Sequence, residues 1–561
     1  MKVWLVILFV GLLFCGLASA ASEGFLITEF CPDGYAKGDG DEYFILSGTG
    51  SLDGWTVSDG EGSISFPAGT STRDQIIVAR EGKAYYDIHA AYPDYEIIGT
   101  VPAVPDAVRI GRFQMANTKD DLSLLRHGRT VQTVSWPDVI TSRNGQIHIF
   151  HDGIWDARVL KIGQSRFVPE TFSADGATFF VSPDCSYEPV LSAVRSADTT
   201  LLISMYEFTH PDIAAAVADA SHRGTAVTIL MEGGPVGGIA DEEKAILDYL
   251  TDAGVRVYTI ESTDSLPARY RYVHTKYFVA DADTTVILSE NFKPSGIPLP
   301  GTRGNRGWGA VLYSSDIAEY FTRVFSADIG GYDIYPYVSG GRDLPESWSD
   351  TGITVQLSPI SLEFVHIEPV FSPDTSNRIP ELLQSASKTI DIQQAYITNY
   401  PGTAHNLWLE SALDAAGRGI TVRILLDAMY YNIDGENDND EIVAQINRIA
   451  KKQNLPVEAR LMHPNGEITK LHNKGLIIDG ETVLISSINW NYNSPNFNRE
   501  SGIIVKNAAA AAYFTKVFEY DWNGGFEKNP LGPGMGLDLR LIAVVGICIA
   551  LTVVWLLRRR K

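Results

Sequence analysis

Residues 181–312 and 371–505 of this 561-residue chain match each other element by element, and this internal repeat limits the possible folds more than any other feature. Each copy shows the pattern of a helix, a strand that ends in Tyr206 or Tyr396, an Ala-rich helix and a further apolar strand. Strand, helix and strand in this order predict parallel βαβ units, so each copy is expected to form an α/β sandwich. Two related halves also predict a pseudo-two-fold arrangement, with a site where they meet.

The same short motif occurs late in each copy. The two versions are Val273-His274-Thr275-Lys276-Tyr277-Phe278-Val279-Ala280-Asp281 and Leu471-His472-Asn473-Lys474-Gly475-Leu476-Ile477-Ile478-Asp479. Alternate residues of a strand share a face, so each His is expected to point the same way as the Lys two positions later. Each pair therefore places a base beside a fixed cation.

A second motif follows on the returning strand of each copy. It is Ser289-x-Asn291 in the first copy and Ser487-x-Asn489 in the second. Imidazole, ammonium, hydroxyl and amide groups that converge twice predict a site for a phosphodiester, whose oxygens accept several hydrogen bonds. Asp281 and Asp479 precede tight turns, and we assign them a structural role first.

The two HxKx4D segments, each followed by Ser-x-Asn and then by Asn305-Arg306 or Asn498-Arg499, resemble the phospholipase D superfamily. The resemblance covers roughly residues 176–525. It implies a phosphodiesterase in which one His attacks phosphorus and the other acts as general acid and base. By resemblance His274 is the nucleophile and His472 the acid and base, while their neighbours stabilise charge on phosphorus. Those neighbours are Lys276, Lys474, Asn291 and Asn489. No cofactor and no metal are expected.

The chain departs from the family pattern at several positions. Leu288 and Ser486 stand where the family usually has Gly, and Gly307 stands where the second copy has Glu500. Glu500 resembles the carboxylate that fixes an imidazole tautomer. One histidine is therefore expected to have a carboxylate partner and the other to lack it, so the first half is expected to be partly decayed.

Other residues near the motifs have two interpretations. Tyr206, Glu207 and Tyr396 end the strands that lead to the site, and they are candidates either for core packing or for substrate contact. Arg306 and Arg499 are expected to be structural, through pairing with carboxylates.

Both ends of the chain carry targeting patterns. Residues 1–20 have an apolar stretch followed by Ala18-Ser19-Ala20, which predicts a signal peptide. Residues 541–557 are uncharged and precede the basic tail 558–561, a pattern that predicts one transmembrane helix with a cytoplasmic C-terminus. The catalytic part is then expected outside the cell, joined to the membrane by a tether, 526–540.

The remaining domain boundaries follow from composition and turn signals. Residues 21–136 predict an all-β, immunoglobulin-like sandwich similar to the lamin-tail domain, with docking to an envelope partner as its expected role. Connectors are expected at 137–175 and 329–366, around phospholipase D-like repeats at 176–328 and 367–525. Cys31 and Cys185 either form one disulfide or remain two free thiols.

Composition helps to choose among the functions. The net charge of −23 argues against a protein that mainly coats nucleic acid or an anionic bilayer, because an acidic surface repels phosphate. Our first hypothesis is an exported, membrane-tethered phosphodiesterase that hydrolyses or transfers phospholipid head groups. A secreted nuclease of the same superfamily, with nucleic acid as its substrate, is one alternative, and a catalytically inactive envelope-binding protein is another.

Overall fold

The computed structural model describes residues 24–136, 144–151, 153–156, 158–344, 357–401 and 406–524. The expected signal peptide, tether, transmembrane helix and basic tail all lie outside these residues. Within the described part of the chain, no helix combines the length and the apolar character that a membrane crossing requires.

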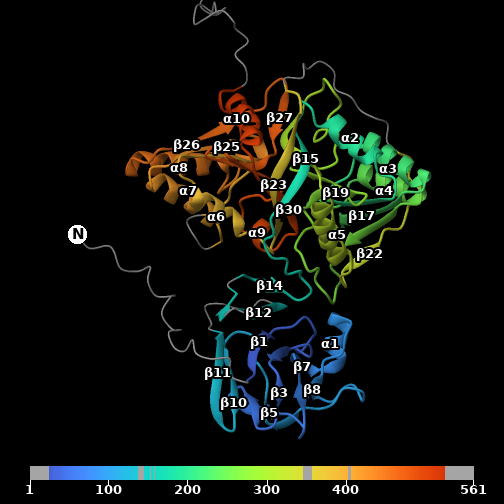
Figure 1. Ribbon diagram of the computed structural model, residues 1–561, viewed down its shortest axis with the longest axis vertical. Coiled ribbons are helices and arrows are strands. Elements are labelled where there is room, and N and C mark those ends of the chain that lie inside the picture. Colours follow the sequence, from blue (N-terminus) through green and yellow to red (C-terminus); the bar gives the residue numbers. More distant parts are fainter. Residues whose placement is uncertain are drawn as a thin grey trace, which may run out of the picture.

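The N-terminal domain consists of two sheets that share one apolar core (Figure 1). The first sheet contains β1 (Leu26–Cys31), β2 (Tyr43–Ser47), β7 (Gln75–Glu81), β8 (Tyr95–Ile98), β12 (Gln146–His151), β13 (Ile154–Trp155) and β14 (Leu160–Lys161). The second contains β4 (Trp55–Ser58), β5 (Gly62–Ser65), β9 (Val108–Gly111), β10 (Asp120–Arg126) and β11 (Arg129–Trp136). Phe44, Val57 and Leu122 are fully buried between them, as alternating strands of a sandwich require. A small pair, β3 (Gly50–Ser51) and β6 (Ser71–Thr72), and one helix, α1 (Gly82–His89), complete the domain.

Part of the segment expected as a connector belongs to this domain. β12 pairs with β1, with Glu29 opposite Ile149, and β14 pairs with β12. Ile147 on β12 is almost fully buried, so the strand contributes to the core as well as to the sheet edge. Arg166 then forms an ion pair with Glu29 at 2.8 Å as the chain leaves the domain.

One 16-stranded sheet runs through both repeats, and its two halves mirror each other. The first half contains β15 (Phe172–Ser182), β16 (Thr200–Met205), β17 (Ala226–Glu232), β18 (Arg256–Ile260), β19 (Lys276–Ala280), β20 (Thr284–Leu288), β21 (Gly304–Tyr313) and β22 (Ile334–Pro336). The second contains β23 (Ile360–Ser372), β24 (Thr389–Gln394), β25 (Thr421–Asp427), β26 (Val457–Met462), β27 (Ile468–Leu471), β28 (Lys474–Ile478), β29 (Thr482–Ser486) and β30 (Glu500–Lys506). From the centre outward the order is β15, β21, β20, β19, β16, β17, β18 on one side and β23, β30, β29, β28, β24, β25, β26 on the other. The parallel pairs β16–β17–β18 and β24–β25–β26 confirm the predicted βαβ units.

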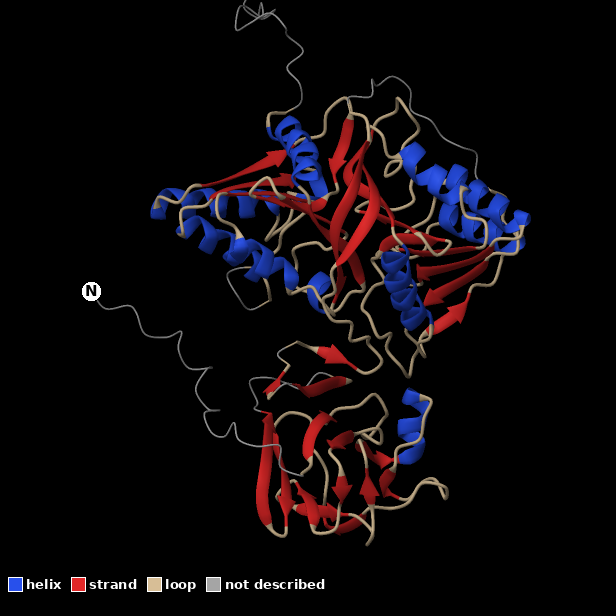
Figure 2. Ribbon diagram, viewed as in Figure 1, coloured by secondary structure: helices blue, strands red, loops and turns tan. Residues whose placement is uncertain are grey.

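Helices cover the sheet in three groups (Figure 2). The apolar core of the first half contains α2 (Tyr187–Arg195), α3 (Pro211–Arg223) and α4 (Asp241–Asp252), and that of the second contains α6 (Arg378–Ser385), α7 (Leu407–Gly417) and α8 (Asn439–Gln453). A third core, between the halves, contains α5 (Ser315–Ile329) and α10 (Ala508–Trp522). A 3-10 turn (Tyr430–Asn432) and α9 (Asn493–Asn496) lie in loops of the second half. Sequence signals set the limits of α3, which has Pro211 in its first turn and ends at Gly224 with a φ of 102°.

The two halves meet at a seam formed by β15 and β23, which pair in antiparallel register from Phe172 opposite Ile367 to Phe179 opposite Ile360. Two buried arginines also cross the seam. Arg306 of the first repeat binds Asp184 and also Asp521 on α10 of the second. Arg499 of the second repeat binds Asp374 and also Asp328 on α5 of the first, at 2.8 Å. Their predicted structural role is confirmed.

The two cysteines in the described part of the chain are unpaired. Cys31 is buried in the N-terminal domain and Cys185 is half-buried beside α2, and both are free thiols. Of the two alternatives that the sequence left open, the structure has the one without a disulfide.

Candidate active site

The backbone of the opposite repeat holds the histidine of each HxKx4D segment in place. His274, just before β19, donates its backbone N–H to the carbonyl of Arg499 at 2.7 Å, and His472, just before β28, donates to the carbonyl of Arg306 at 3.0 Å. Each imidazole also contacts a carboxylate of the opposite repeat, His274 that of Glu500 and His472 that of Glu290. The predicted meeting of the two repeats at a shared centre is therefore confirmed.

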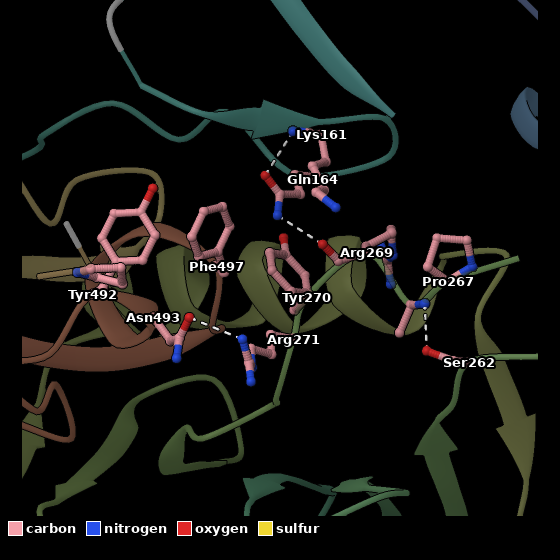
Figure 3. A pocket seen from close by; sticks show the side chains of 12 residues that line it. Lys161, Gln164, Ser262, Pro267, Arg269, Tyr270, Arg271, Tyr492, Asn493 and Phe497 are labelled. Atoms are coloured by element: carbon pink, nitrogen blue, oxygen red, sulfur yellow. Dashed lines mark hydrogen bonds between the residues drawn. The ribbon is translucent and has the colours of Figure 1, made fainter. Parts of the chain in front are cut away.

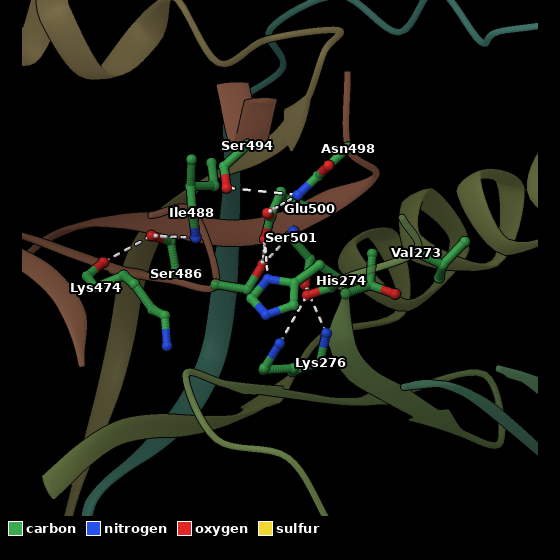
Figure 4. Close-up of polar contacts among 12 residues, drawn as sticks. Val273, His274, Lys276, Lys474, Ser486, Ile488, Ser494, Asn498, Glu500 and Ser501 are labelled. Atoms are coloured by element: carbon green, nitrogen blue, oxygen red, sulfur yellow. Dashed lines mark hydrogen bonds and ion pairs between the residues drawn. The ribbon is translucent and has the colours of Figure 1, made fainter. Parts of the chain in front are cut away.

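The carboxylate of Glu500 orients the first imidazole. The Nδ1 atom of His274 lies 2.7 Å from Oε2 of Glu500, which β30 of the opposite repeat carries (Figure 4). Ser487 donates to the same carboxylate at 2.6 Å and Asn498 at 2.9 Å, so Glu500 cannot rotate freely. With Nδ1 engaged by a carboxylate, Nε2 is left to face a substrate.

The second imidazole also has a carboxylate partner, and this corrects the expectation from sequence. Nδ1 of His472 lies 3.1 Å from Oε1 of Glu290, and the side chain of Glu290 is almost fully buried. Glu290 is the middle residue of the Ser289-x-Asn291 motif, a position to which the sequence analysis assigned no role. The expectation of a missing partner and a partly decayed first half was wrong, because that half supplies its carboxylate from a different position.

Both lysines are fully buried and fold back on the histidine that precedes them. Lys276 donates its ammonium group to the carbonyl of His274 at 2.9 Å, and Lys474 donates to the carbonyl of His472 at 2.6 Å. Figure 4 shows both lysines beside the His274 imidazole, and both of their charges disfavour its protonation. The site therefore concentrates positive charge where phosphoryl oxygens would bind.

Burial shifts the pKa values of these groups. Desolvation lowers the pKa of His274 to about 4, although Glu500 raises it. Burial and the nearby charges of Lys474 and Lys470 hold the pKa of His472 well below its ordinary value. Both imidazoles are consequently neutral near pH 7, as a nitrogen nucleophile requires.

The amides and hydroxyls of the second motif divide into two roles. Asn291 donates its amide to Glu207 at 2.8 Å, and the Oδ1 atoms of Asn291 and Asn489 are both buried without a hydrogen-bond partner. Ser289 accepts a hydrogen bond from the backbone of Trp308 at 2.9 Å, and Ser487 holds Glu500. The serines thus support the framework of the site, and the asparagines border it.

The two aspartates that end the HxKx4D segments bind backbone. Asp281 accepts hydrogen bonds from the N–H groups of residues 198–200, and Asp479 accepts from those of residues 387–389. Both aspartates adopt a left-handed backbone conformation, with φ of 54° and 56°. This geometry supports the structural role that we expected for them.

A model of the family described as "Cardiolipin synthase, PLD-like domain" matches residues 190–329 and 379–522, about half of the chain, and the two matches coincide with the two repeats. The chain belongs to the phospholipase D-like family. The Chlamydomonas reinhardtii protein named mitochondrial cardiolipin hydrolase is 26% identical over 158 residues, which are 28% of this chain and 62% of that relative. The match therefore spans about three fifths of the length of this curated relative.

Two solved structures illustrate the range of similar folds. The phosphatidylserine synthase of Haemophilus influenzae has a TM-score of 0.45 and 14% identity, covering 62% of this chain and 85% of that one. Nuc from Salmonella typhimurium, a phospholipase D family member, has a TM-score of 0.24 and 23% identity, covering 30% of this chain and 99% of that one.

The candidate substrate-contact residues of this phospholipase D-like site lie in different settings. Tyr206 packs edge-on against the imidazole of His274, with ring centroids 4.8 Å apart, and its hydroxyl accepts from the backbone of Val236. Glu207 binds Asn291 and pairs with Lys293 at 3.2 Å. Tyr396 in the second repeat accepts from Asn491 at 2.9 Å. All three side chains are half-buried, and Tyr206 and Glu207 border the site.

A pocket of about 580 Å³ lies between Lys161 on β14 and the loop residues Arg269, Tyr270 and Arg271 (Figure 3). Its lining residues are Lys161, Gln164, Ser262, Pro267, Ala268, Arg269, Tyr270, Arg271, Pro401, Tyr492, Asn493 and Phe497. Three are basic, three are aromatic and none is acidic, in a protein with a net charge of −23. Arg271 stands three residues before His274, in the loop that leads to β19. The sequence analysis missed this pocket, because its lining comes from distant segments.

Proposed function

We propose that the chain is a phospholipase D-like phosphodiesterase that hydrolyses phospholipid head groups or transfers them to another alcohol. The observation that carries the proposal is the pair of buried His–carboxylate contacts, each joining the two repeats at one lysine-rich centre. The alternative of an inactive envelope protein rested on Leu288 and on a missing carboxylate, and the contact of Glu290 with His472 argues against the second reason.

The proposed reaction uses the free Nε2 atoms of both histidines. His274 attacks phosphorus, and a P–N bond forms as the P–O bond to the leaving alcohol breaks. In this step His472 is the imidazolium, protonated on Nε2 as well as Nδ1 once the anionic phosphate is bound beside it, and it gives the Nε2 proton to the leaving oxygen. His472 then removes a proton from water or an acceptor alcohol, whose oxygen displaces His274 from phosphorus. Lys276 and Lys474 stabilise the charge on the five-coordinate phosphorus during both steps.

We infer that the substrate is a phospholipid from the similar proteins and from the charge of the chain. The matching family model and the curated relative both carry the names of cardiolipin enzymes. Strong net acidity opposes the long phosphate contacts of a nuclease, whereas the basic pocket is compact enough to take one further anionic group beside the scissile phosphate.

The location of the reaction is part of the proposal. An export signal at residues 1–20 and a membrane anchor at 541–557 would place the catalytic repeats outside the cytoplasm, close to a bilayer surface. The tether, 526–540, is short enough to keep the site near its lipid.

The decisive experiment measures head-group release by the full chain from vesicles of phosphatidylcholine, phosphatidylglycerol or cardiolipin in the presence of EDTA. We expect turnover that His274→Ala and His472→Ala both abolish, while His463→Ala, at an exposed histidine, has wild-type activity. A protein that nicks plasmid DNA with no lipid turnover would move the assignment to a nuclease. Intact-mass analysis of quenched reactions should find the phosphoryl adduct on His274, and an adduct on His472 would reverse the two roles.

A further inference from the structure

The two repeats carry their catalytic carboxylates at different positions. In the second copy the carboxylate follows Asn498-Arg499, as Glu500, and Ile488 occupies the middle of the Ser-x-Asn motif. In the first copy Gly307 follows Asn-Arg, and Glu290 occupies the middle of the Ser-x-Asn motif. Each copy therefore has one carboxylate and one uncharged residue at these two positions, in exchanged places.

The two carboxylates nevertheless make the same contacts. Glu500 binds Nδ1 of His274 and accepts from Asn498 at 2.9 Å, and Glu290 binds Nδ1 of His472 and accepts from Asn305 at 2.9 Å. Each therefore joins the histidine of the opposite repeat to the asparagine of its own Asn-Arg pair. The side chains of Glu290 and Glu500 start from different positions in their repeats, yet each brings a carboxylate to the Nδ1 atom of the opposite histidine.

The space around Gly307 explains why the first repeat has no side chain at this position while Glu290 is present. A Cβ atom at Gly307 would lie 2.5 Å from Cγ and 2.6 Å from Oε1 of Glu290, and 2.8 Å from Oγ of Ser289. Real Cβ atoms do not approach other atoms so closely. The side chain of Glu290 thus fills the volume that a side chain at position 307 would need.

We propose that Glu290 is the positioning residue for His472, that it replaces a carboxylate at position 307, and that Gly307 is glycine in order to make room for it. This inference rests on the proposed function and adds one residue pair to it. The role of Glu290 is to accept the Nδ1–H of His472, so that Nε2 faces the reacting oxygens, giving its proton to the leaving one and taking a proton from the entering one.

A swap of the two residues tests the proposal. Glu290→Ile copies the second repeat and removes the carboxylate, so kcat on a phosphodiester should fall by about 10². Gly307→Glu alone should also lose activity, because two side chains then compete for one volume. The double variant Glu290→Ile/Gly307→Glu restores the arrangement of the second repeat, and we expect it to recover at least about tenfold over Glu290→Ile.

Controls separate a positioning role from a merely structural one. Glu290→Gln keeps the shape of the side chain without its negative charge. Glu188→Ile, the matched substitution at an exposed residue of α2, is expected to have wild-type activity. In protein with ¹⁵N-labelled histidine, His472 should be in its Nδ1–H tautomer in the wild type and lose that preference in Glu290→Ile. This measurement needs no turnover, so it remains informative if the proposed substrate is wrong.

The outcomes are distinct. Wild-type protein that is inert on every phosphodiester overturns the proposed function, and the tautomer of His472 then decides the positioning role alone. Active wild type with unchanged kcat in Glu290→Ile, an unchanged tautomer, or a double variant no better than the single one would overturn this inference.

Discussion

At the scale of single residues, the most informative group is the buried ammonium of Lys276. Desolvation lowers the pKa of Lys276 to about 8, although Glu500 raises it. Its charge is present below that pH and is lost above it, so we expect kcat to fall as the pH rises through about 8. A steady-state profile from pH 6 to 10 measures this, and recovery of activity on return to pH 7 separates titration from unfolding. A profile that stays flat to pH 10 would show that the Lys276 charge does not contribute to the rate.

A second residue-scale prediction concerns Arg271 in the basic pocket. Its guanidinium is exposed and binds Asn493 at 3.1 Å. If this pocket holds an anionic group of the substrate away from the scissile phosphate, Arg271→Gln should raise KM by about tenfold and leave kcat within about twofold. The matched control is Arg256→Gln, at an exposed arginine of β18 outside the pocket. Equal effects of the two variants would remove the pocket from substrate binding.

At the scale of elements, Asp281 and Asp479 each anchor the start of a strand to the turn after the catalytic segment. Asp281→Ala leaves three backbone N–H groups without their acceptor and puts Ala at a left-handed φ of 54°. We expect a loss of about 2 kcal/mol in stability, with kcat per folded molecule unchanged. Urea unfolding measures the loss, and Asp281→Asn, which tolerates this φ and still accepts, should lose less. A selective fall in kcat would instead give Asp281 a direct part in catalysis.

The elements also show which features the sequence could predict. The His–Lys pairs and the aspartate turns were predictable, because alternation along a strand and local hydrogen bonds depend only on neighbouring residues. The pairing of His472 with Glu290 was not, because the two residues are far apart in sequence and meet only when the halves pack. The addition of β12 to the first N-terminal sheet has the same cause, since strand pairing depends on partners distant in sequence.

At the scale of the whole molecule, the arginine pairs across the seam should stabilise both repeats together. Arg499→Met leaves Asp328 and Asp374 buried with less compensation, and we expect it to destabilise the protein by about 3–5 kcal/mol. Arg323→Met, at a surface pair with Glu170, should cost less than about 1 kcal/mol. Thermal unfolding followed by circular dichroism compares the two variants. Similar midpoints for both would show that the buried pairs do not hold the halves together.

The hydrogen-bonded ladder from β15 to β23 also restricts how a lipid reaches the histidines. Enzymes that swing two domains apart around a hinge have few backbone bonds to break at the dividing line. Here, a hinge motion that separated the two halves would break the backbone hydrogen bonds between β15 and β23 and expose the buried arginine–aspartate pairs. We therefore expect lipid entry and product release to depend on local rearrangement of surface loops, while the two repeats keep their positions relative to each other.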